Sequence, residues 1–227
     1  MKGKLIVIEG TDCSGKETQS NLLIAKLKEQ GIRVEKFSFP NYNSPTGKIV
    51  GGPYLGKDYI CDGWFPEGAA LVDPKVASLY YAADRKYNIY KIIWLLDQGV
   101  NVLLDRYIFS NMAHQGGKIL DSEKRREMYK WLEKLEFELL ELPKPDIAIF
   151  LHLPYEYSLE LKSGREEALD QLERDENNMR CAEQAYVEIA QIYRFKTIDC
   201  VYQNEIKTID DISHEVYDYV YQKIKKL

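Results

Sequence analysis

The 227-residue sequence lacks the features that would place a protein in a membrane or outside the cell. It has no apolar run approaching the roughly 20 residues that a membrane-spanning helix needs. Its first residues show no charged segment followed by a long apolar one, so we expect no secretory signal peptide. The four cysteines form no Cys-x-x-Cys pair, which disfavours structural zinc and a disulfide framework. We therefore expect reduced thiols and a cytoplasmic location.

The sequence also lacks an excess of positive charge. Its formal net charge is −5, and no basic stripe is visible along it. Because nucleic-acid polymers bind to clustered lysine and arginine, we expect no such polymer as a partner. There is no internal repeat, no low-complexity tract and no linker, so residues 1–227 are interpreted as a single domain. An Asn-Lys-x-Asp guanine-reading motif is missing too, which disfavours a GTPase.

What the sequence does contain is a regular alternation of apolar strands and helices. Strands are expected at residues 4–9, 32–39, 101–105, 146–153 and 195–200, and the first helix at 16–30. The continuous apolar run "KLIVIE" at 4–9 indicates a strand buried on both faces. The intervening segments are long enough to be helical crossovers between parallel strands. This order predicts an α/β fold with three layers, a five-stranded parallel sheet and helices on both faces; together with the phosphate-binding segment described below, it is expected to be of the P-loop NTPase type.

The helix expected over residues 74–98 carries two stripes. Asp73 and Pro74 give it an N-cap and a proline at the first helical position. Its apolar residues recur at helical spacing and are expected to face the core: Val76, Leu79, Tyr80, Ala83, Tyr87, Tyr90 and Trp94. Tyr81 and Arg85 lie four residues apart on another stripe, so their side chains are expected to project together.

Two more helices and two irregular segments complete the predicted outline. A helix is expected at 122–142, and a last one from about residue 208 should bury Ile212, Val216, Val220 and Ile224. Residues 51–73 are rich in glycine and aromatics, which is typical of a long functional loop. Residues 162–175 are dense in charge and join two helical stretches.

The segment "GTDCSGKETQ" at residues 10–19 follows the first predicted strand and opens the first predicted helix. Gly10, Gly15 and Lys16 match the phosphate-binding pattern G-x-x-x-x-G-K. In such a loop, backbone N–H groups and the helix N-terminus bind phosphate oxygens, and the lysine adds a positive charge. A chance glycine turn is the alternative, but the preceding strand favours nucleotide binding. The predicted ATP-binding residues are Gly10, Thr11, Asp12, Cys13, Ser14, Gly15, Lys16, Glu17 and Thr18.

Two carboxylates are candidates for holding Mg²⁺. Glu17 stands where the pattern has the serine or threonine that binds the metal. It could coordinate the ion, hold a metal-bound water, or only favour the helix N-terminus electrostatically. Asp105 ends the strand "NVLLD", and ligands of open α/β sheets bind at the carboxyl ends of strands. Because aspartate often ends strands without a function, the assignment of Asp105 depends on the phosphate loop.

The order of the motifs resembles the thymidylate kinase family over essentially the whole chain. The family pattern EGxDGxGKxTQ is matched by "EGTDCSGKETQ", including Glu9, Asp12, Thr18 and Gln19. The pattern DR-Y/H-xx-S-xx-A-Y-Q is matched by "DRYIFSNMAHQ" except at one position, and "FP" and "LYYAADR" lie between the two. The resemblance implies transfer of the γ-phosphoryl group of ATP to deoxythymidine monophosphate with Mg²⁺. It also implies a short lid at about 162–175 and, commonly, a homodimer.

The resemblance further implies roles for particular residues. Asp12 would meet the sugar 3′-hydroxyl, while Lys16 and Arg106 would act in catalysis, Arg106 by holding the acceptor phosphate. Tyr81 would stack on thymine and Arg85 would donate to the thymine carbonyl; a core aromatic beside a surface arginine is the alternative for this pair. The other substrate-binding residues expected from the family are Phe39, Pro40, Tyr42, Ser110, His114 and Gln115.

Several positions depart from the family pattern. Tyr42 stands where many members have arginine, so a hydroxyl would replace a charged phosphate contact. His114 replaces a tyrosine that packs near the sugar, and a plain capping or surface histidine is its alternative. Cys13 stands where some members carry a catalytic arginine. Leu161, with Lys162 beside it, stands where an arginine packs on adenine, and Lys162 is the nearest cation predicted to contact ATP.

The lid expected at about 162–175 is the natural source of the positive charge that Cys13 does not supply. A positive charge on the transferring phosphoryl group contributes a large rate factor in phosphoryl transfer. Arg165 is the predicted catalytic residue, with Lys162 and Arg174 as alternates. A solvated run of charge is the alternative interpretation.

Two other functions are compatible with these residues. The acceptor could be another deoxynucleotide, such as dUMP or dGMP, and Tyr42, His114 and residues 51–73 all bear on that choice. A nucleotide-binding regulator without turnover is the other, and Glu17 is its main support. The joint presence of Arg85, Arg106 and the lid cations favours the kinase.

Overall fold

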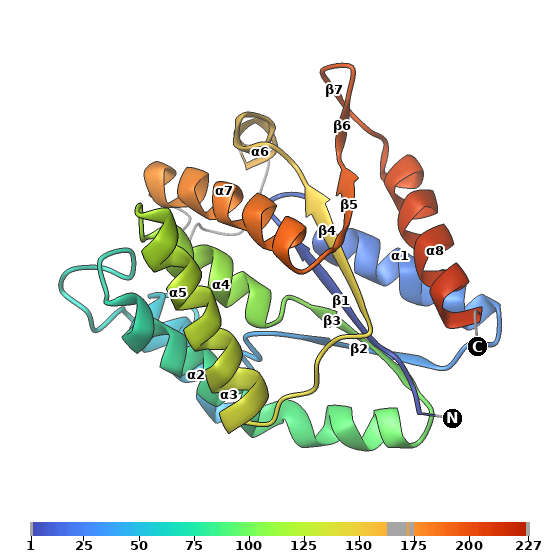
Figure 1. Ribbon diagram of the computed structural model, residues 1–227, viewed down its shortest axis with the longest axis horizontal. Coiled ribbons are helices and arrows are strands. Elements are labelled where there is room, and N and C mark those ends of the chain that lie inside the picture. Colours follow the sequence, from blue (N-terminus) through green and yellow to red (C-terminus); the bar gives the residue numbers. More distant parts are fainter. Residues whose placement is uncertain (1, 163–171, 173–174, 226–227) are drawn as a thin grey trace.

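The structure, a computed structural model, describes residues 2–162, 172 and 175–225. A five-stranded parallel sheet in the order β2-β3-β1-β4-β5 forms its centre (Figure 1). The strands are β1 (Leu5–Gly10), β2 (Val34–Ser38), β3 (Asn101–Asp105), β4 (Ile147–His152) and β5 (Lys196–Asp199). The predicted α/β class and all five predicted strands are confirmed, with small shifts at the strand ends.

Helices cover both faces of this sheet (Figure 1). Along β1, Leu5 and Val7 point into the core on one face, and Ile6 and Ile8 point into the core on the other. This alternation follows from the two-residue period of a strand and explains why "KLIVIE" is apolar throughout. One face is covered by α1 (Lys16–Glu29) and α8 (Ile209–Lys225), and the other by α3 (Pro74–Asp97), α4 (Ile108–Gly117), α5 (Ser122–Glu133) and α7 (Glu176–Ile192).

Helix α8 buries the stripe that the sequence predicts. Ile212, Val216 and Val220 are buried against α1 and the sheet, and Ile224 is partly buried. The prediction for α8 is therefore confirmed.

Helix α3 begins at the predicted residues, but the face that it buries is not the predicted one. Asp73 caps it by accepting hydrogen bonds from the backbone N–H groups of Lys75 and Val76. The predicted core stripe is wrong. Of its members only Tyr80 is partly buried, and the others are exposed: Val76, Leu79, Ala83, Tyr87, Tyr90 and Trp94. The residues that α3 buries are Ala77, Ser78, Ala82, Asp84, Arg85, Ile89, Ile92, Leu95 and Leu96.

The buried polar residues on α3 have partners, which is why the helix can turn them inward. The carboxylate of Asp84, 1% exposed, accepts hydrogen bonds from the Asn41 N–H at 2.8 Å and the Ser44 hydroxyl at 3.0 Å. The Thr46 hydroxyl and the Asn88 amide also donate to Asp84, at 2.9 and 2.8 Å. Buried polar groups are tolerated where hydrogen bonds replace those lost to water.

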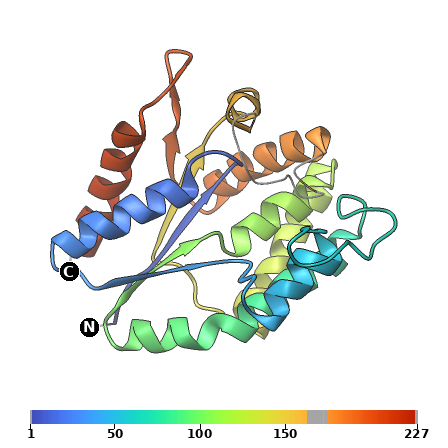
Figure 2. The ribbon, with the colours of Figure 1, turned by 180° about the vertical axis from the view of Figure 1, so that it is seen from behind.

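The segment expected to be irregular at 51–73 begins with helical turns. Ser44 caps the short helix α2 (Pro45–Ile49), which continues into a π-helical turn, η1 (Val50–Tyr54). The chain then runs through turns, and Figure 2 shows it as the teal loop at the right-hand edge of the molecule. Its inward side chains join Val50, Ala77 of α3 and Leu172 in a small separate core, to which the segment contributes Tyr54, Leu55, Ala69 and Val72.

The elements not yet described are a π-helical segment after α5, the helix α6 and a small hairpin. The helix predicted at 122–142 forms α5 followed by a π-helical segment, η2 (Lys134–Leu139). Helix α6 (Tyr155–Lys162) follows β4, and a small hairpin, β6 (Val201–Tyr202) with β7 (Glu205–Ile206), follows β5. The sequence analysis did not predict this hairpin. Within the described residues, no helix is both long enough and apolar enough to cross a membrane.

Candidate active site

The phosphate-loop sequence forms a tight turn between β1 and α1. Gly15 has a φ of 75° immediately before α1, a left-handed conformation that glycine adopts without strain. A Cβ at Gly10 would lie 2.5 Å from the Ser14 hydroxyl and 2.7 Å from the Leu151 carbonyl oxygen, so only glycine fits there. The turn therefore has the geometry needed to present backbone N–H groups and the α1 N-terminus to an anion.

Lys16 is held at this turn. Its side chain is 8% exposed and its Nζ donates to the Thr11 carbonyl oxygen at 2.6 Å. Burial, together with the nearby positive charge of Arg106, lowers the pKa of Lys16 to about 8. An arriving phosphate would favour the charged form, because an opposite charge at short range stabilises the ammonium.

A buried glutamate at the end of β1 holds the start of α4. Glu9 Oε1 accepts hydrogen bonds from the backbone N–H groups of Tyr107 and Ser110, at 2.7 and 3.2 Å. Its Oε2 accepts from the Ser110 hydroxyl at 2.6 Å and from the Tyr186 hydroxyl at 3.3 Å. Burial raises the pKa of Glu9, and the Ser110 hydrogen bond acts in the other direction. This carboxylate supplies α4 with an N-terminal acceptor that its own N-cap residue, Tyr107, does not provide.

Arg106 lies beside the phosphate loop in a constrained backbone conformation, with a φ of 68°. Its Nη2 donates to Asp12 Oδ1 at 2.7 Å, and its Nη1 donates to the hydroxyls of Ser110 and Tyr186, each at 3.3 Å. The parallel pairing of β3 with β1 explains this proximity, because Asp105 is paired with Ile8. The structure thus brings Asp12 and Arg106, two predicted site residues, into direct contact.

A cavity of about 310 Å³ opens at this edge of the sheet. It is lined by most of the residues predicted to bind the acceptor or the metal: Asp12, Glu17, Phe39, Pro40, Tyr42, Tyr81, Arg85, Asp105, Arg106, Ser110 and His114. Gln115 does not line it; its Nε2 donates to the Tyr54 hydroxyl at 3.3 Å, and its side chain is fully buried. Arg165 and Arg174 lie outside the described residues, and the side chain of Lys162 is likewise not described.

Arg85 enters the cavity from the buried face of α3. Its Nε and Nη2 both donate to the carboxylate of Glu136, and both side chains are almost completely buried, at 2% and 0% exposed. The alternative of a surface arginine is therefore wrong. Tyr81, one helical turn earlier, packs edge-on against Tyr54 with ring centroids 5.8 Å apart.

His114 is partly buried and lines the cavity. Burial lowers its pKa to about 4. Its ring packs edge-on against Tyr186, and its Nδ1 has no hydrogen-bond partner among the described residues. Its place in the cavity wall with Asp12 and Ser110 disfavours the alternative of a surface histidine.

The two metal candidates line the same cavity. Asp105 also has Lys36 Nζ 4.0 Å from its Oδ2. No group of three or more His, Cys, Asp or Glu side chains suited to a metal exists in the part of the chain that the structure describes. This donor set fits Mg²⁺, which is usually bound through one or two carboxylates, substrate phosphates and water rather than by a full protein cage.

Several residues of the site carry no distinctive sequence signal. Glu136, Tyr186, Lys36 and Lys57 contact the predicted residues or line the cavity, yet each is an ordinary charged or aromatic residue within its predicted element. Tyr107 and Asn111, which lie in the second motif, could have been included from their positions.

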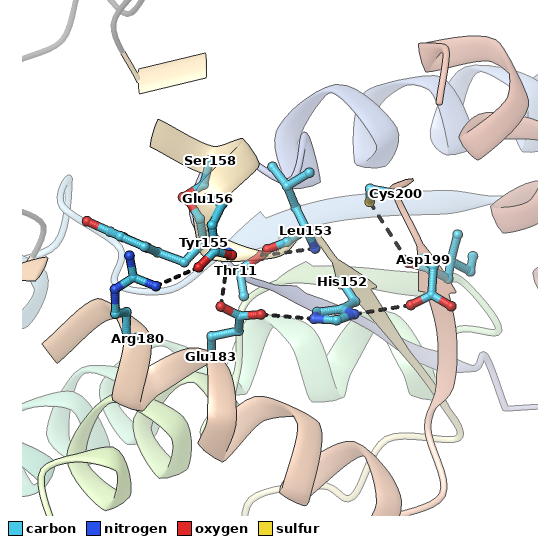
Figure 3. A network of polar contacts seen from close by, with 11 residues as sticks. Thr11, His152, Leu153, Tyr155, Glu156, Ser158, Arg180, Glu183, Asp199 and Cys200 are labelled. Atoms are coloured by element: carbon cyan, nitrogen blue, oxygen red, sulfur yellow. Dashed lines mark hydrogen bonds and ion pairs between the residues drawn. The ribbon is translucent and has the colours of Figure 1, made fainter. Parts of the chain in front are cut away.

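A second polar network lies at the end of β4 (Figure 3). His152 Nε2 lies 3.1 Å from Glu183 Oε1, and its Nδ1 lies 3.1 Å from Asp199 Oδ1. The other oxygen of Glu183 accepts the N–H of Tyr155 at the start of α6. Thr11 of the phosphate loop donates to the Leu153 carbonyl at 2.7 Å. This network connects the phosphate loop to the helix that leads into residues 163–171.

Comparisons with known proteins agree with this geometry. The family model described as "Thymidylate kinase" matches residues 8–211. The chain is 29% identical over 219 residues to a thymidylate kinase of Schizosaccharomyces pombe, covering 96% of this chain and 92% of the relative. It is 30% identical over 217 residues to a probable thymidylate kinase of Pyrococcus horikoshii, covering 95% of each chain. A solved thymidylate kinase of Candida albicans, described as having broad substrate specificity, superimposes with a TM-score of 0.74 at 26% identity, covering 98% of this chain and 93% of that one.

Proposed function

The chain belongs to the thymidylate kinase family, and we propose that it transfers the γ-phosphoryl group of ATP to deoxythymidine monophosphate to give the diphosphate. The observation that carries the proposal is the cavity in which Asp12 and Arg106, beside the phosphate loop, share walls with Tyr81 and Arg85 of α3. An acceptor with its phosphate near Arg106 and its base near Arg85 would direct that phosphate toward Lys16 and the donor.

The protein would contribute to the reaction by positioning the two nucleotides and by neutralising the charge on their phosphates. The acceptor phosphate is already an anion, so no general base is needed. Lys16 would hold the outer phosphates of the donor, and Arg106 would hold the acceptor phosphate while Asp12 fixes the orientation of its guanidinium. Asp105 and Glu17 would hold Mg²⁺, which would supply charge neutralisation at the phosphates.

The lid remains part of the proposal. Residues at about 162–175 would close over both nucleotides, with Arg165 supplying a cation to the transferring phosphoryl group and Lys162 or Arg174 as alternates. We keep the interpretation of one domain over residues 1–227 and a cytoplasmic location.

A homodimer formed through α3 also belongs to the proposal. The exposed stripe on this helix includes Leu79, Tyr87, Tyr90 and Trp94, which are 50, 57, 67 and 60% exposed. A contiguous exposed apolar surface is typical of a protein interface, and aromatic side chains contribute much of the binding energy there. A second copy of this chain, presenting the same stripe across a two-fold axis, is the proposed occupant.

The proposal is tested by steady-state phosphorylation with ATP and Mg²⁺ across dTMP, dUMP, dGMP, dCMP and the ribonucleotides. We expect the highest kcat/KM with dTMP, and none above background in a Lys16→Met control that still folds. A higher kcat/KM with another base would overturn the acceptor assignment. Binding of ATP without turnover on any acceptor would favour the silent regulator that Glu17 suggests.

A further inference from the structure

The carboxylate of Glu136 is fully buried and does not line the cavity, but it binds side chains that do. It lies in the π-helical segment η2 and accepts hydrogen bonds from Nε and Nη2 of Arg85. It also accepts from the Asn111 amide nitrogen at 3.4 Å. Arg85 and Asn111 both line the cavity, so one carboxylate holds two of the cavity's polar side chains.

Stability alone does not explain this arrangement. Removing a carboxylate and a guanidinium from water is costly, and apolar side chains of similar volume often give equal or greater stability. Buried charges that are retained despite this cost are candidates for a role in specificity. A π-helical turn within an α-helix is also frequent at functional sites.

The contacts of Glu136 decide which atoms face the ligand. Side-on pairing through Nε and Nη2 leaves the two N–H groups of Nη1 and the second N–H of Nη2, so the guanidinium of Arg85 can only donate to a ligand. The Asn111 amide nitrogen is committed to Glu136 and to the Ser78 carbonyl oxygen, each at 3.4 Å. Asn111 Oδ1 is buried and has no hydrogen-bond partner in the described part of the chain. On one side of the cavity Arg85 is therefore a fixed donor, and Asn111 beside it carries a buried oxygen whose hydrogen-bonding capacity is unfilled.

We propose that Glu136 is a positioning residue that sets the base selectivity of the acceptor cavity through Arg85 and Asn111. The carbonyl oxygen at C4 of thymine or uracil accepts a hydrogen bond from Arg85, and the neighbouring N3–H donates to Asn111. Cytosine presents an amino donor and a ring-nitrogen acceptor at these positions, which reverses both pairings. This inference rests on the proposed function, since it concerns the base of the proposed acceptor.

The test is steady-state kinetics of Glu136→Gln with dTMP, dUMP and dCMP at saturating ATP. The substitution keeps the volume of the side chain but removes the charge that holds Arg85, and it lets the Asn111 amide turn over. We expect kcat/KM for dTMP to fall about 10- to 100-fold, mainly through KM, because the hydrogen bonds to the base become misaligned. The dTMP-to-dCMP ratio of kcat/KM should narrow at least about tenfold for the same reason, and KM for ATP should stay unchanged.

Glu188→Gln is the matched control. Glu188 also pairs with arginines, Arg125 and Arg126, but between α5 and α7 and away from the cavity. We expect this variant to keep the dTMP-to-dCMP ratio of the unmodified chain. In an Arg85→Gln background, Glu136→Gln should add little to the loss with dTMP, because the two residues act as one unit.

Glu136→Asp keeps the test decisive if Glu136→Gln does not fold. The shorter carboxylate keeps its charge but cannot reach both Arg85 nitrogens in the same way, so an intermediate loss of selectivity is expected. A folded Gln or Asp variant that retains the full dTMP-to-dCMP ratio would overturn the inference. Failure of the proposed function would look different, because the unmodified chain would then show no preference for dTMP.

Discussion

Two helices of this protein, α3 and α8, carry apolar stripes at helical spacing, and only α8 buries its stripe. Val216 and Val220 of α8 are fully buried, whereas Tyr90 and Trp94 of α3 are more than half exposed. What α3 buries instead includes an aspartate and an arginine, each with hydrogen-bond partners. The difference shows that an apolar stripe at helical spacing does not by itself determine which face of a helix the core buries.

The largest expected effect, on both activity and stability, comes from a substitution on the buried polar face of α3. Arg85→Met should lower kcat/KM for dTMP by about 100- to 1,000-fold, because a site built to hydrogen-bond a base loses its charged donor. It should also lower the free energy of unfolding by about 3–5 kcal/mol, since Glu136 is left buried without its cation. Kinetics and urea denaturation measure the two effects.

Arg125→Met is the control for that variant. Arg125 pairs with Glu188 at 2.8 Å, but its side chain is 21% exposed and it lies away from the cavity. The kinetics with dTMP should be unchanged. If Arg85→Met kept kcat/KM within tenfold of the unmodified chain, the buried face of α3 would have no role in acceptor binding.

The next largest effect is a loss of stability, expected from a substitution in the apolar stripe that α8 buries. Val216→Ala should lower the free energy of unfolding by about 2 kcal/mol, because two methyl groups leave a fully packed core. Ile209→Ala at the exposed start of the same helix, where the side chain is 58% exposed, should change it by less than about 0.5 kcal/mol. Equal losses in the two variants would show that α8 is not anchored through this stripe.

A smaller effect on folding is expected from the stripe that α3 exposes. The double variant Tyr90→Ser/Trp94→Ser should change the unfolding free energy of the monomer by less than about 1 kcal/mol, because neither side chain is in the core. It should weaken self-association at least about 100-fold, measured by sedimentation velocity over a range of concentrations, because interface aromatics carry much of the binding energy.

Leu120→Ser serves as the control for the interface, since Leu120 is 80% exposed but lies outside the stripe. Its association should match that of the unmodified chain. A double variant that sediments like the unmodified protein would remove α3 from the proposed interface.

The smallest effect is expected from His152 and its two carboxylate partners, Glu183 and Asp199. These three side chains are more exposed than the buried pair of Arg85 and Glu136. The hydrogen bond with Glu183 raises the pKa of His152, burial opposes it, and Asp199 adds to the rise. A histidine whose pKa is raised on folding stabilises the protein fully below its unfolded value of about 6.5. That contribution is lost as the pH rises through the folded value.

His152→Gln should therefore lower Tm at pH 6 and have little effect at pH 9, with a difference corresponding to about 1 kcal/mol or less because Asp199 is well exposed. Thermal melts of both proteins at the two pH values measure it. An effect that grows with pH would contradict the assignment of a charged His152 at low pH.

Much of the fold follows from local sequence features. The strands are short apolar runs bounded by glycine, proline or charge, and the phosphate loop is a local turn whose geometry depends on Gly10 and Gly15. The four-residue spacing of Tyr81 and Arg85 predicted that they project together, and the family resemblance assigned them to the acceptor site, although the same helix was given the wrong core face. Local spacing shows which side chains project together but not whether they project inward.

The residues that sequence reasoning missed depend on contacts across long separations. Glu136 meets Arg85 across 51 positions, and Tyr186 meets Glu9 across 177. Nothing in the "EKLEFELLEL" run distinguishes Glu136 from its neighbouring glutamates, since all are common in helices. Only packing against α3 and α4 makes one of them the acceptor for a buried arginine.

The sequence by itself determined the order of strands and helices, the phosphate-binding turn and the placement of Asp105 at a strand end. These depend on backbone preferences and hydrophobic periodicity, which act over a few residues. The tertiary structure decided that α3 turns Asp84 and Arg85 inward and its aromatics outward. It could do so because Asn41, Ser44 and Glu136 supply hydrogen-bond partners to the buried charges, and such partners exist only once distant segments have come together.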